Sequence, residues 1–178
     1  RDIPSDNVVA GNKRTSLRLD IQGELKRRGT ICRCIRCREV RQQQVDQAAL
    51  RLDDLVYNAG GAEEHFLSFV TPQDRLAGFL RLSLPGVNSP STGLADLEGA
   101  AIIREVHVFG QSLQVGTEQA GAAQHSGLGT RLLERAEEIA REYGFSRLAV
   151  IAAVGTRRYY QERGFISGEL YMVKTSDT

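Results

Sequence analysis

The sequence has 178 residues, of which 41% are hydrophobic and 25% charged, and its net charge is +1. This composition is that of an ordinary globular protein with room for about one domain. No apolar run approaches the roughly 18 residues that a membrane-spanning helix needs, and no stretch has the pattern of a signal peptide. We therefore expect a cytoplasmic protein that does not contact a membrane.

The charge is distributed unevenly. Residues 1–41 carry 11 Lys and Arg against 5 Asp and Glu, whereas residues 42–178 carry 12 against 17. A basic end favours an anionic partner, nucleic acid first, although a solvated basic face is an equally common explanation. The chain begins with Arg1 rather than methionine, and we expect it to be a piece of a longer protein.

The first 47 residues are predicted to form a linker segment rather than a domain. Residues 1–15 have no clear period, which is typical of irregular chain. Apolar residues recur every four positions over residues 17–28, between a serine that can cap a helix and a glycine that can end it. This pattern predicts a single helix.

The three cysteines of the chain lie close together, at Cys32, Cys34 and Cys37. Disulfide bonds between cysteines this close in sequence could not cross-link distant parts of a fold. Thiolates, by contrast, are preferred ligands of structural zinc, so the pattern favours a Zn²⁺ site. Zinc normally takes four ligands, and the fourth would be His65 or a residue from a missing part of the protein. An iron–sulfur cluster would also need a fourth thiolate, and three reduced, packed thiols are the remaining interpretation.

Residues 48–178 are predicted to form one α+β domain. Three runs of strand length are separated by turn residues, which predicts an antiparallel meander, and a loop then leads to a fourth strand. An amphipathic helix, a strand, a short helix and a last strand follow. The predicted strands are residues 50–58, 64–71, 75–84, 100–109, 146–153 and 165–174, and the predicted helices are residues 127–143 and 155–164.

The fourth predicted strand carries two titratable side chains, Glu105 and His107. Alternation places them on one face together with Ile103 and Phe109. They could polarise a substrate or transfer a proton as a general base, while a cross-strand polar pair is the more ordinary explanation. Residues 110–123, which follow, have the composition of a flexible lid or of a loop that contacts a partner.

The most informative motif is Gln124-His-Ser-Gly-Leu-Gly-Thr130, which is predicted to open the long helix. Its two glycines lack the Cβ atoms that hold a ligand away from the backbone, and the N–H groups of a helix start bind anions, most often phosphate. A Walker loop would need Gly-Lys-Ser/Thr here, and a dinucleotide fingerprint would directly follow a strand. Neither condition is met, and an ordinary glycine-rich helix start is the alternative.

This Q-x-x-G-x-G loop resembles the pyrophosphate loop of the GNAT acetyltransferases, which hold acetyl-CoA. The predicted order β-β-β-β-α-β-α-β, with the central helix after the fourth strand, is similar to theirs. The resemblance implies the GNAT acyl-CoA N-acyltransferase fold, an α+β fold of the three-layer α/β type. In such a fold helices flank a mixed, mostly antiparallel sheet, and the fourth and fifth strands splay apart to bind the pantetheine arm.

Further segments, in order over nearly the whole chain, match a narrower pattern. They are RDIPS at residues 1–5, AGNK at 10–13, CRCIRCRE at 32–39, IREVHVFG at 103–110, QHSGLG at 124–129, GTRRYY at 155–160 and YMVK at 171–174. Together they resemble the catalytic subunits of Elongator, a family of tRNA uridine acetyltransferases. In that family a radical-SAM half, with S-adenosylmethionine and an iron–sulfur cluster, precedes an acetyltransferase half. By this resemblance residues 1–47 are the end of the first half and residues 48–178 the GNAT domain.

The resemblance implies a function and its partners. The domain would bind acetyl-CoA and supply acetyl for the carboxymethyl modification of the wobble uridine of tRNA. Its partners would be tRNA, the missing radical-SAM half, and other Elongator subunits or a second copy of the chain. The basic residues that would face the tRNA are Lys13, Arg14, Lys26, Arg27, Arg28, Arg33, Arg36 and Arg38.

Site residues follow from the same resemblance. The backbone of the fourth strand would line the thioester and the pantetheine arm, and the glycine motif would hold the phosphates. These cofactor-binding residues are Glu105, Val106, His107, Val108, Gln124, Gly127, Leu128, Gly129 and Thr130. Tyr160 would reach the thioester sulfur and protonate the leaving thiolate, whereas Tyr159 would pack. Phe109 stands where the family often has tyrosine, which leaves no hydroxyl at that position.

Two other functions are compatible with the sequence. One is simple N-acetylation of a protein lysine or a small amine, as is common in the superfamily, although such an enzyme does not need the basic segment with its cysteines. The other is a non-catalytic module in which zinc and basic residues dock RNA beside a vestigial cofactor cleft.

Overall fold

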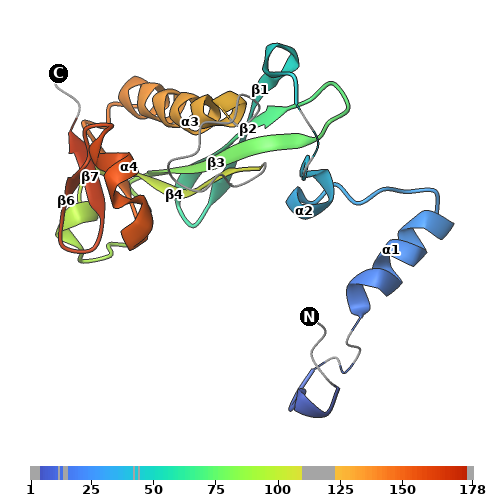
Figure 1. Ribbon diagram of the computed structural model, residues 1–178. Helices are drawn as coiled ribbons and strands as arrows, with labels where there is room; N and C mark the ends of the chain where they lie inside the picture. The colour runs from blue at the N-terminus through green and yellow to red at the C-terminus, as the bar shows by residue number, and fades with distance from the viewer. Residues whose placement is uncertain are drawn as a thin grey trace. The chain divides into compact units, whose positions relative to one another are not determined.

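The computed structural model describes residues 5–11, 13, 16–41, 43, 45–109 and 123–175, without the side chains of residues 5 and 123–126 (Figure 1). The chain divides into two compact units, residues 1–38 and residues 39–178. None of the described helices combines the length and the apolar character that crossing a lipid bilayer requires.

The first unit contains the 3₁₀ helix η1 (Ser5–Asn7) and the α-helices α1 (Leu17–Arg27) and α2 (Ile35–Arg38). The strands of the second unit are β1 (Arg51–Ala59), β2 (Ala62–Val70), β3 (Leu76–Pro85), β4 (Ala100–Val108), β5 (Arg147–Val150), β6 (Ile166–Ser167) and β7 (Met172–Thr175). Its helices are η2 (Gln47–Ala49), η3 (Ala95–Leu97), α3 (Ala123–Glu142), η4 (Val154–Thr156) and α4 (Arg157–Gln161).

In the described part of the chain, seven strands form one sheet in the order β1-β2-β3-β4-β5-β7-β6. The predicted meander is confirmed, since β1 to β4 pair antiparallel with their sequence neighbours. The pair β4–β5 is parallel, and β7 pairs antiparallel with both β5 and β6. The sheet is therefore mixed and mostly antiparallel, as the sequence predicts.

Helix α3 covers one face of this sheet and contributes much of the core (Figure 1). Its apolar residues recur at helical spacing, and six of them are buried: Leu128, Leu132, Leu133, Ala136, Ile139 and Ala140. They pack against buried side chains of β2 to β5, among them Leu67, Leu80, Ile103 and Leu148. Burying one such aliphatic side chain stabilises the fold by about 1.5–3 kcal/mol.

The strict alternation predicted for the fourth strand is wrong at one point. Leu82 pairs with Ile103 and Arg81 with Glu105, so Arg104 is an extra residue in a β-bulge. A bulge shifts the residues beyond it to the other face. Ile103 consequently faces α3, whereas Glu105 and His107 lie on the opposite face, and Val106 packs against the core below α3.

The last predicted strand, residues 165–174, is also wrong as a single element. It is split into the short antiparallel pair β6–β7, and the backbone N–H of Gly168 donates to the carbonyl of Tyr171 across the turn. A carboxylate oxygen of Asp96 accepts the N–H groups of Leu170 and Tyr171 at 2.8 and 2.9 Å. A side chain from η3, which is distant in the sequence, therefore organises this turn.

Residues 39–41, 43 and 45–47, which the sequence assigns to the linker segment, pack with the second unit. Val40 and Val45 are buried members of its core, and Glu39 forms an isolated parallel bridge with Leu76. The guanidinium of Arg75 also donates to the carbonyl of Glu39 at 2.8 Å. These contacts explain why the compact unit begins at residue 39.

Candidate functional site

Strands β4 and β5 part halfway along β4. Their parallel pairing runs from Ala100↔Arg147 to Ile103↔Val150 and then stops, while β4 continues to Val108 and stays paired with β3. Over residues 104–108 the outer edge of β4 has no strand partner in the described part of the chain. Backbone groups on such an edge can bind an extended ligand or stabilise an oxyanion.

Helix α3 begins at Ala123, one turn before the predicted start at Gly127. In a regular α-helix each N–H donates to the carbonyl four residues earlier, so the amides of residues 123–125 have no partner within the helix. The amides of Gly127 and Thr130 are therefore not the free donors that the sequence predicts. The side chain of Gln124 and the predicted lid over residues 110–122 lie outside the described residues.

The two glycines of the motif have different surroundings. A Cβ atom on Gly127 would meet nothing within 4 Å, so no neighbouring atom of the described residues crowds this glycine. A Cβ atom on Gly129 would lie 2.8 Å from the hydroxyl oxygen of Tyr159 and 3.6 Å from a methyl of Val108. Gly129 therefore makes room for a tyrosine side chain of the protein itself.

A guanidinium that no sequence pattern selects connects this tyrosine to α3. Arg163, in the turn after α4, donates through Nε and Nη2 to the hydroxyl of Thr130 at 3.2 and 2.8 Å. Its Nη1 donates to the carbonyl of Tyr159 at 2.7 Å, and its central carbon lies 3.6 Å from the centroid of that ring. This geometry is a cation–π contact that holds Tyr159 against α3. No motif marks such a residue, because its partners come from a different helix.

The two tyrosines of the pair have different surroundings. Tyr160 is 7% exposed and belongs to the core, where its ring makes edge-on contacts with Tyr159 and Phe165. Burial raises the pKa of the Tyr160 phenol, because the charged form loses its solvation. Successive helical residues point about 100° apart, which sends Tyr159 toward Gly129 and Tyr160 inward.

Glu105 and His107 do share a face, as predicted, and it is the face opposite α3. The Glu105 carboxylate lies 3.5 Å from Nε of Arg81. The His107 ring stacks on Phe79 at a centroid distance of 5.9 Å and makes a tilted contact with Phe109 at 4.6 Å. Both residues are exposed. The ion pair with Arg81 is the cross-strand interaction that the ordinary explanation predicts.

The cysteine motif forms a compact cluster in the first unit. The Sγ atoms of Cys32, Cys34 and Cys37 lie within 4.8 Å of one another, as ligands of one tetrahedral ion must. Hydrogen bonds from the Cys32 side chain and the Cys37 backbone lower the pKa of the Cys34 thiol to about 7. Arg18 of α1 contacts Sγ of Cys37 at 3.2 Å and adds positive charge beside these thiols. The donor set fits zinc.

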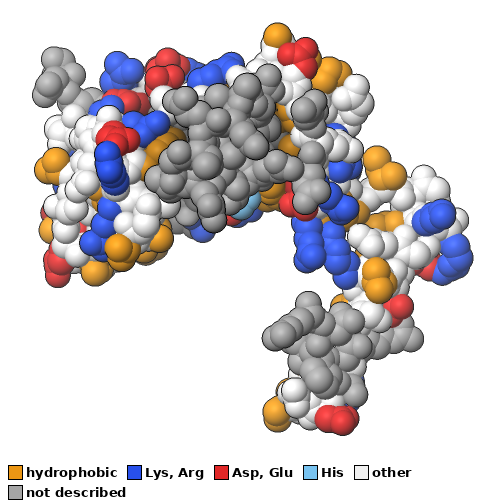
Figure 2. Space-filling view, viewed as in Figure 1, with side chains coloured by type: hydrophobic (Ala, Val, Ile, Leu, Met, Phe, Trp, Pro, Cys, Tyr) orange, Lys and Arg blue, Asp and Glu red, His pale blue; other side chains and the backbone are white. Residues whose placement is uncertain are grey.

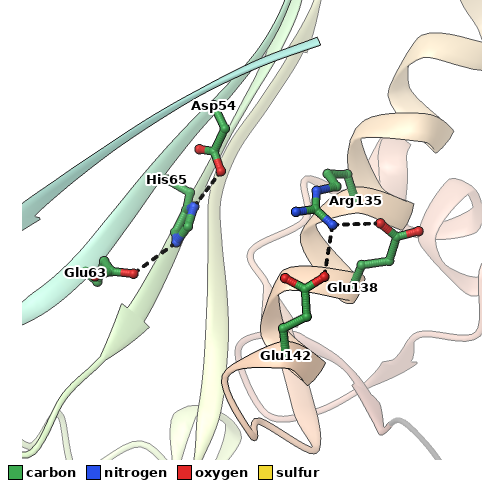
Figure 3. Close-up of polar contacts among 6 residues, drawn as sticks. All are labelled: Asp54, Glu63, His65, Arg135, Glu138 and Glu142. Carbon is green, nitrogen blue, oxygen red and sulfur yellow. Dashed lines mark hydrogen bonds and ion pairs between the residues drawn. The ribbon is translucent and has the colours of Figure 1, made fainter.

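His65, the candidate fourth ligand, is engaged elsewhere in the second unit (Figure 3). It is buried on β2, with Nδ1 at 2.9 Å from a carboxylate oxygen of Asp54 and Nε2 at 3.3 Å from one of Glu63. Its ring also meets Tyr143 edge-on at 5.7 Å. Among the described residues no fourth ligand joins the cysteines.

The basic residues of the first unit lie on its surface, where several blue side chains are visible (Figure 2). Lys13, Lys26, Arg27, Arg28, Arg33 and Arg36 are exposed and Arg38 is half-buried, whereas Arg14 lies outside the described residues. Glu24 pairs with Arg27 and Arg28 on α1. The arrangement leaves a basic surface, which suits contacts with phosphate groups.

Comparisons with known proteins define the class. The model of the acetyltransferase (GNAT) family matches residues 32–165. This match spans the meander, the parting of β4 and β5, and helix α3. The chain therefore belongs to the GNAT acetyltransferase family.

More specific relatives cover nearly the whole chain. It is 40% identical to the tRNA uridine(34) acetyltransferase of Dehalococcoides mccartyi, over 99% of this chain and 39% of that protein. It is 41% identical to Elongator complex protein 3 of Danio rerio, over 98% of this chain and 32% of that protein. A solved structure of the archaeal Methanocaldococcus infernus Elp3 with an N-terminal deletion matches at 31% identity with a TM-score of 0.76, over 98% of this chain and 42% of that one. The chain thus spans less than half of the length of these relatives.

Proposed function

We propose that this chain is the acetyl-CoA-dependent half of a tRNA uridine acetyltransferase. It binds acetyl-CoA and supplies the acetyl unit for carboxymethyl modification of the wobble uridine. The observation that carries this proposal is the parting of β4 and β5 after Ile103 and Val150, next to the start of α3. Membership of the GNAT family and the similarity to a tRNA uridine(34) acetyltransferase and to Elongator complex protein 3 support the same assignment.

The residues of this chain have distinct roles in the proposal. The backbone of Glu105, Val106, His107 and Val108 forms the free edge that holds the pantetheine arm and polarises the thioester carbonyl. The beginning of α3, with the open Gly127, binds the diphosphate through amides and the helix dipole. Tyr160 donates a proton near the sulfur; a tyrosine phenol is protonated at neutral pH, and burial raises the pKa of Tyr160 further above its ordinary value.

In this proposal the cysteine cluster and the basic surface contribute to tRNA binding. Cys32, Cys34 and Cys37 hold Zn²⁺ with a fourth ligand from outside the described residues. Such an ion would hold the segment from Cys32 to Cys37 together, and the contact of Arg18 with Sγ of Cys37 joins this segment to α1, next to the basic residues that contact phosphates. A radical-SAM half, with S-adenosylmethionine and an iron–sulfur cluster, is the proposed partner, and the complete enzyme works in the cytoplasm.

Calorimetry with acetyl-CoA, followed by thioester cleavage assays, tests the proposal. We expect binding with a dissociation constant in the micromolar range, typical of enzyme–substrate pairs, and cleavage that is accelerated by tRNA. Cleavage that is indifferent to tRNA but accelerated by a lysine peptide indicates an N-acetyltransferase instead. The absence of any acetyl-CoA binding would indicate a non-catalytic module.

A further inference from the structure

A row of aromatic rings crosses the sheet on the face opposite α3. Phe66 of β2, Phe79 of β3 and His107 of β4 form it, and Phe79 pairs directly with His107 across the two strands. The rings of Phe66 and Phe79 stack at a centroid distance of 5.2 Å with planes 29° apart, and those of Phe79 and His107 at 5.9 Å and 19°. These distances are typical of offset stacking. The row therefore runs from β2 to β4 with its ring planes close to parallel.

The rings of this row differ in exposure. Phe79, in the middle, is 2% exposed, because the rings on the two neighbouring strands flank it. Phe66, at one end, is half-buried, and the guanidinium carbon of Arg81 lies 5.9 Å from its centroid. His107, at the other end, is exposed. Phe109 meets the imidazole at a tilt of 52°, so Phe79 is the one ring of the described residues that stacks on His107.

The exposed end of the row coincides with the parting of β4 and β5. His107 belongs to the segment 104–108, whose outer edge has no strand partner among the described residues. The pairing of β5 with β4 ends at Val150, opposite Ile103, so β5 places no side chain beside His107. A planar group that enters at the parting can therefore extend the row by one ring.

The surroundings of His107 indicate what kind of planar group fits. Aromatic side chains, histidine included, are the surfaces on which proteins stack the unpaired bases of RNA. A group stacked on the exposed His107 keeps its edges in water, which suits a base with polar edges better than an apolar side chain. The carboxylate of Glu105, on the same face of β4, is paired with Arg81 at 3.5 Å. Phosphate groups beside such a base therefore do not meet an unpaired carboxylate there.

The two faces of the sheet also separate an acyl donor from an acceptor. Helix α3 packs on one face, and its beginning is the proposed diphosphate site. The imidazole of His107 lies on the other face. A donor held at the beginning of α3 and a base stacked on His107 would therefore approach the free edge of β4 from opposite sides.

We propose that His107 stacks the acceptor base, an unpaired pyrimidine of RNA, at the parting of β4 and β5. The base lies with one face on the imidazole and continues the row beyond β4, beside the backbone edge that holds the thioester. The role needs a flat ring and no proton transfer by the imidazole. The inference rests on the proposed function and deepens it, because it names a side chain that orients the acceptor.

The ligand-side test compares a planar base with a non-planar one on the full chain. The probe is a short RNA stem-loop with uridine at the wobble position, and the matched control carries dihydrouridine there. Dihydrouracil keeps the hydrogen-bonding edge of uracil, but its ring is puckered. We expect the control RNA to bind about tenfold more weakly, as for the loss of one stacked base. Equal affinities, or no binding of either RNA, would overturn the inference.

The protein-side test asks whether this discrimination depends on the ring of His107. In His107→Ala the two RNAs should bind with equal affinity, whereas His107→Phe keeps a stacking surface and should keep most of the difference. Tyr57→Ala is the control, because Tyr57 is a 40% exposed ring on the same sheet face but outside the row, and the difference should persist. Discrimination that survives in folded His107→Ala, or is lost in folded His107→Phe, contradicts the inference.

A measurement on the wild-type chain decides if the variants do not fold. The uridine RNA should shift the NMR resonances of the imidazole C–H groups of His107 more than the dihydrouridine RNA does, and equal shifts would contradict stacking. The inference depends on the ratio of two RNA affinities, whereas the proposed function depends on acetyl-CoA binding and cleavage. A chain that binds and cleaves acetyl-CoA but does not discriminate between the RNAs therefore disproves the inference alone.

Discussion

At the scale of single residues, Gly129 shows how a motif glycine can serve the protein rather than a ligand. Gly129→Ala would place a Cβ atom 2.8 Å from the Tyr159 hydroxyl oxygen. We expect a loss of stability of about 1–3 kcal/mol, as for overpacked cores. Tyr159→Phe removes that oxygen and leaves the nearest atoms at 3.6 and 3.7 Å, so the double variant should recover most of the loss. Chemical denaturation of the four proteins measures this coupling.

The neighbouring glycine is the matched control. A Cβ atom on Gly127 meets nothing within 4 Å, and alanine is a better helix former than glycine by up to about 1 kcal/mol. Gly127→Ala should therefore be neutral or stabilising in the free chain. A destabilisation of Gly127→Ala equal to that of Gly129→Ala would disprove the steric explanation. A weaker affinity of Gly127→Ala for acetyl-CoA would support the ligand role of this position.

Asp96 gives a prediction about pH. Backbone N–H groups of Tyr171 and Leu170 donate to its carboxylate and lower its pKa. The pKa of an aspartate in the unfolded chain is about 3.9, and the pKa of Asp96 in the folded protein is lower. The stability that Asp96 contributes is therefore fully present above the unfolded pKa and is lost as the pH falls through the folded pKa. The stability difference between wild type and Asp96→Asn should therefore shrink below about pH 4. Denaturation curves between about pH 3 and pH 7 test this, and a constant difference would contradict it.

At the scale of elements, the cysteine motif predicts one metal ion in the first unit. Three thiol sulfurs within 4.8 Å can chelate zinc together. We expect elemental analysis to find about one zinc per chain and Cys34→Ser to lose most of it. His65→Ala should keep its zinc, because His65 pairs with Asp54 in the other unit. Zinc that persists when all three cysteines are replaced would place the ion elsewhere.

The elements were predictable where a pattern is local. Leu17, Ile21 and Leu25 recur at helical spacing, and α1 occupies that stretch. The bulge at Arg104 adds one residue without changing the composition of β4, so alternation cannot reveal it. The turn between β6 and β7 depends on Asp96, and Arg163 acts on Thr130 of α3; both contacts join residues far apart in sequence. Such features follow from tertiary structure, which a single sequence does not display.

At the scale of the whole molecule, the boundary between the two units predicts which truncated fragment of the chain keeps its stability. A fragment of residues 39–178 keeps Val40 and Val45, which are buried in the core of the second unit. We expect it to unfold with the stability of the same unit in the full chain. A fragment of residues 48–178 lacks both valines and should lose about 1.5–3 kcal/mol for each. Thermal and chemical denaturation of the two fragments compares them, and equal stabilities would show that residues 39–47 contribute nothing.

The parallel pair β4–β5 also constrains how the chain folds. Strands β1 to β4 meet their partners through turns and one loop, so their contacts are close in sequence and can form early. Strands β4 and β5, which pair from Ala100↔Arg147 onward, are instead connected by a crossover that contains α3. Because parallel strands need such a crossover, β5 can pair with β4 only after the helix has been synthesised. During synthesis the meander can assemble while β5 is still absent. Its apolar face stays uncovered until α3 arrives, and that interval is when the nascent chain is most exposed to aggregation.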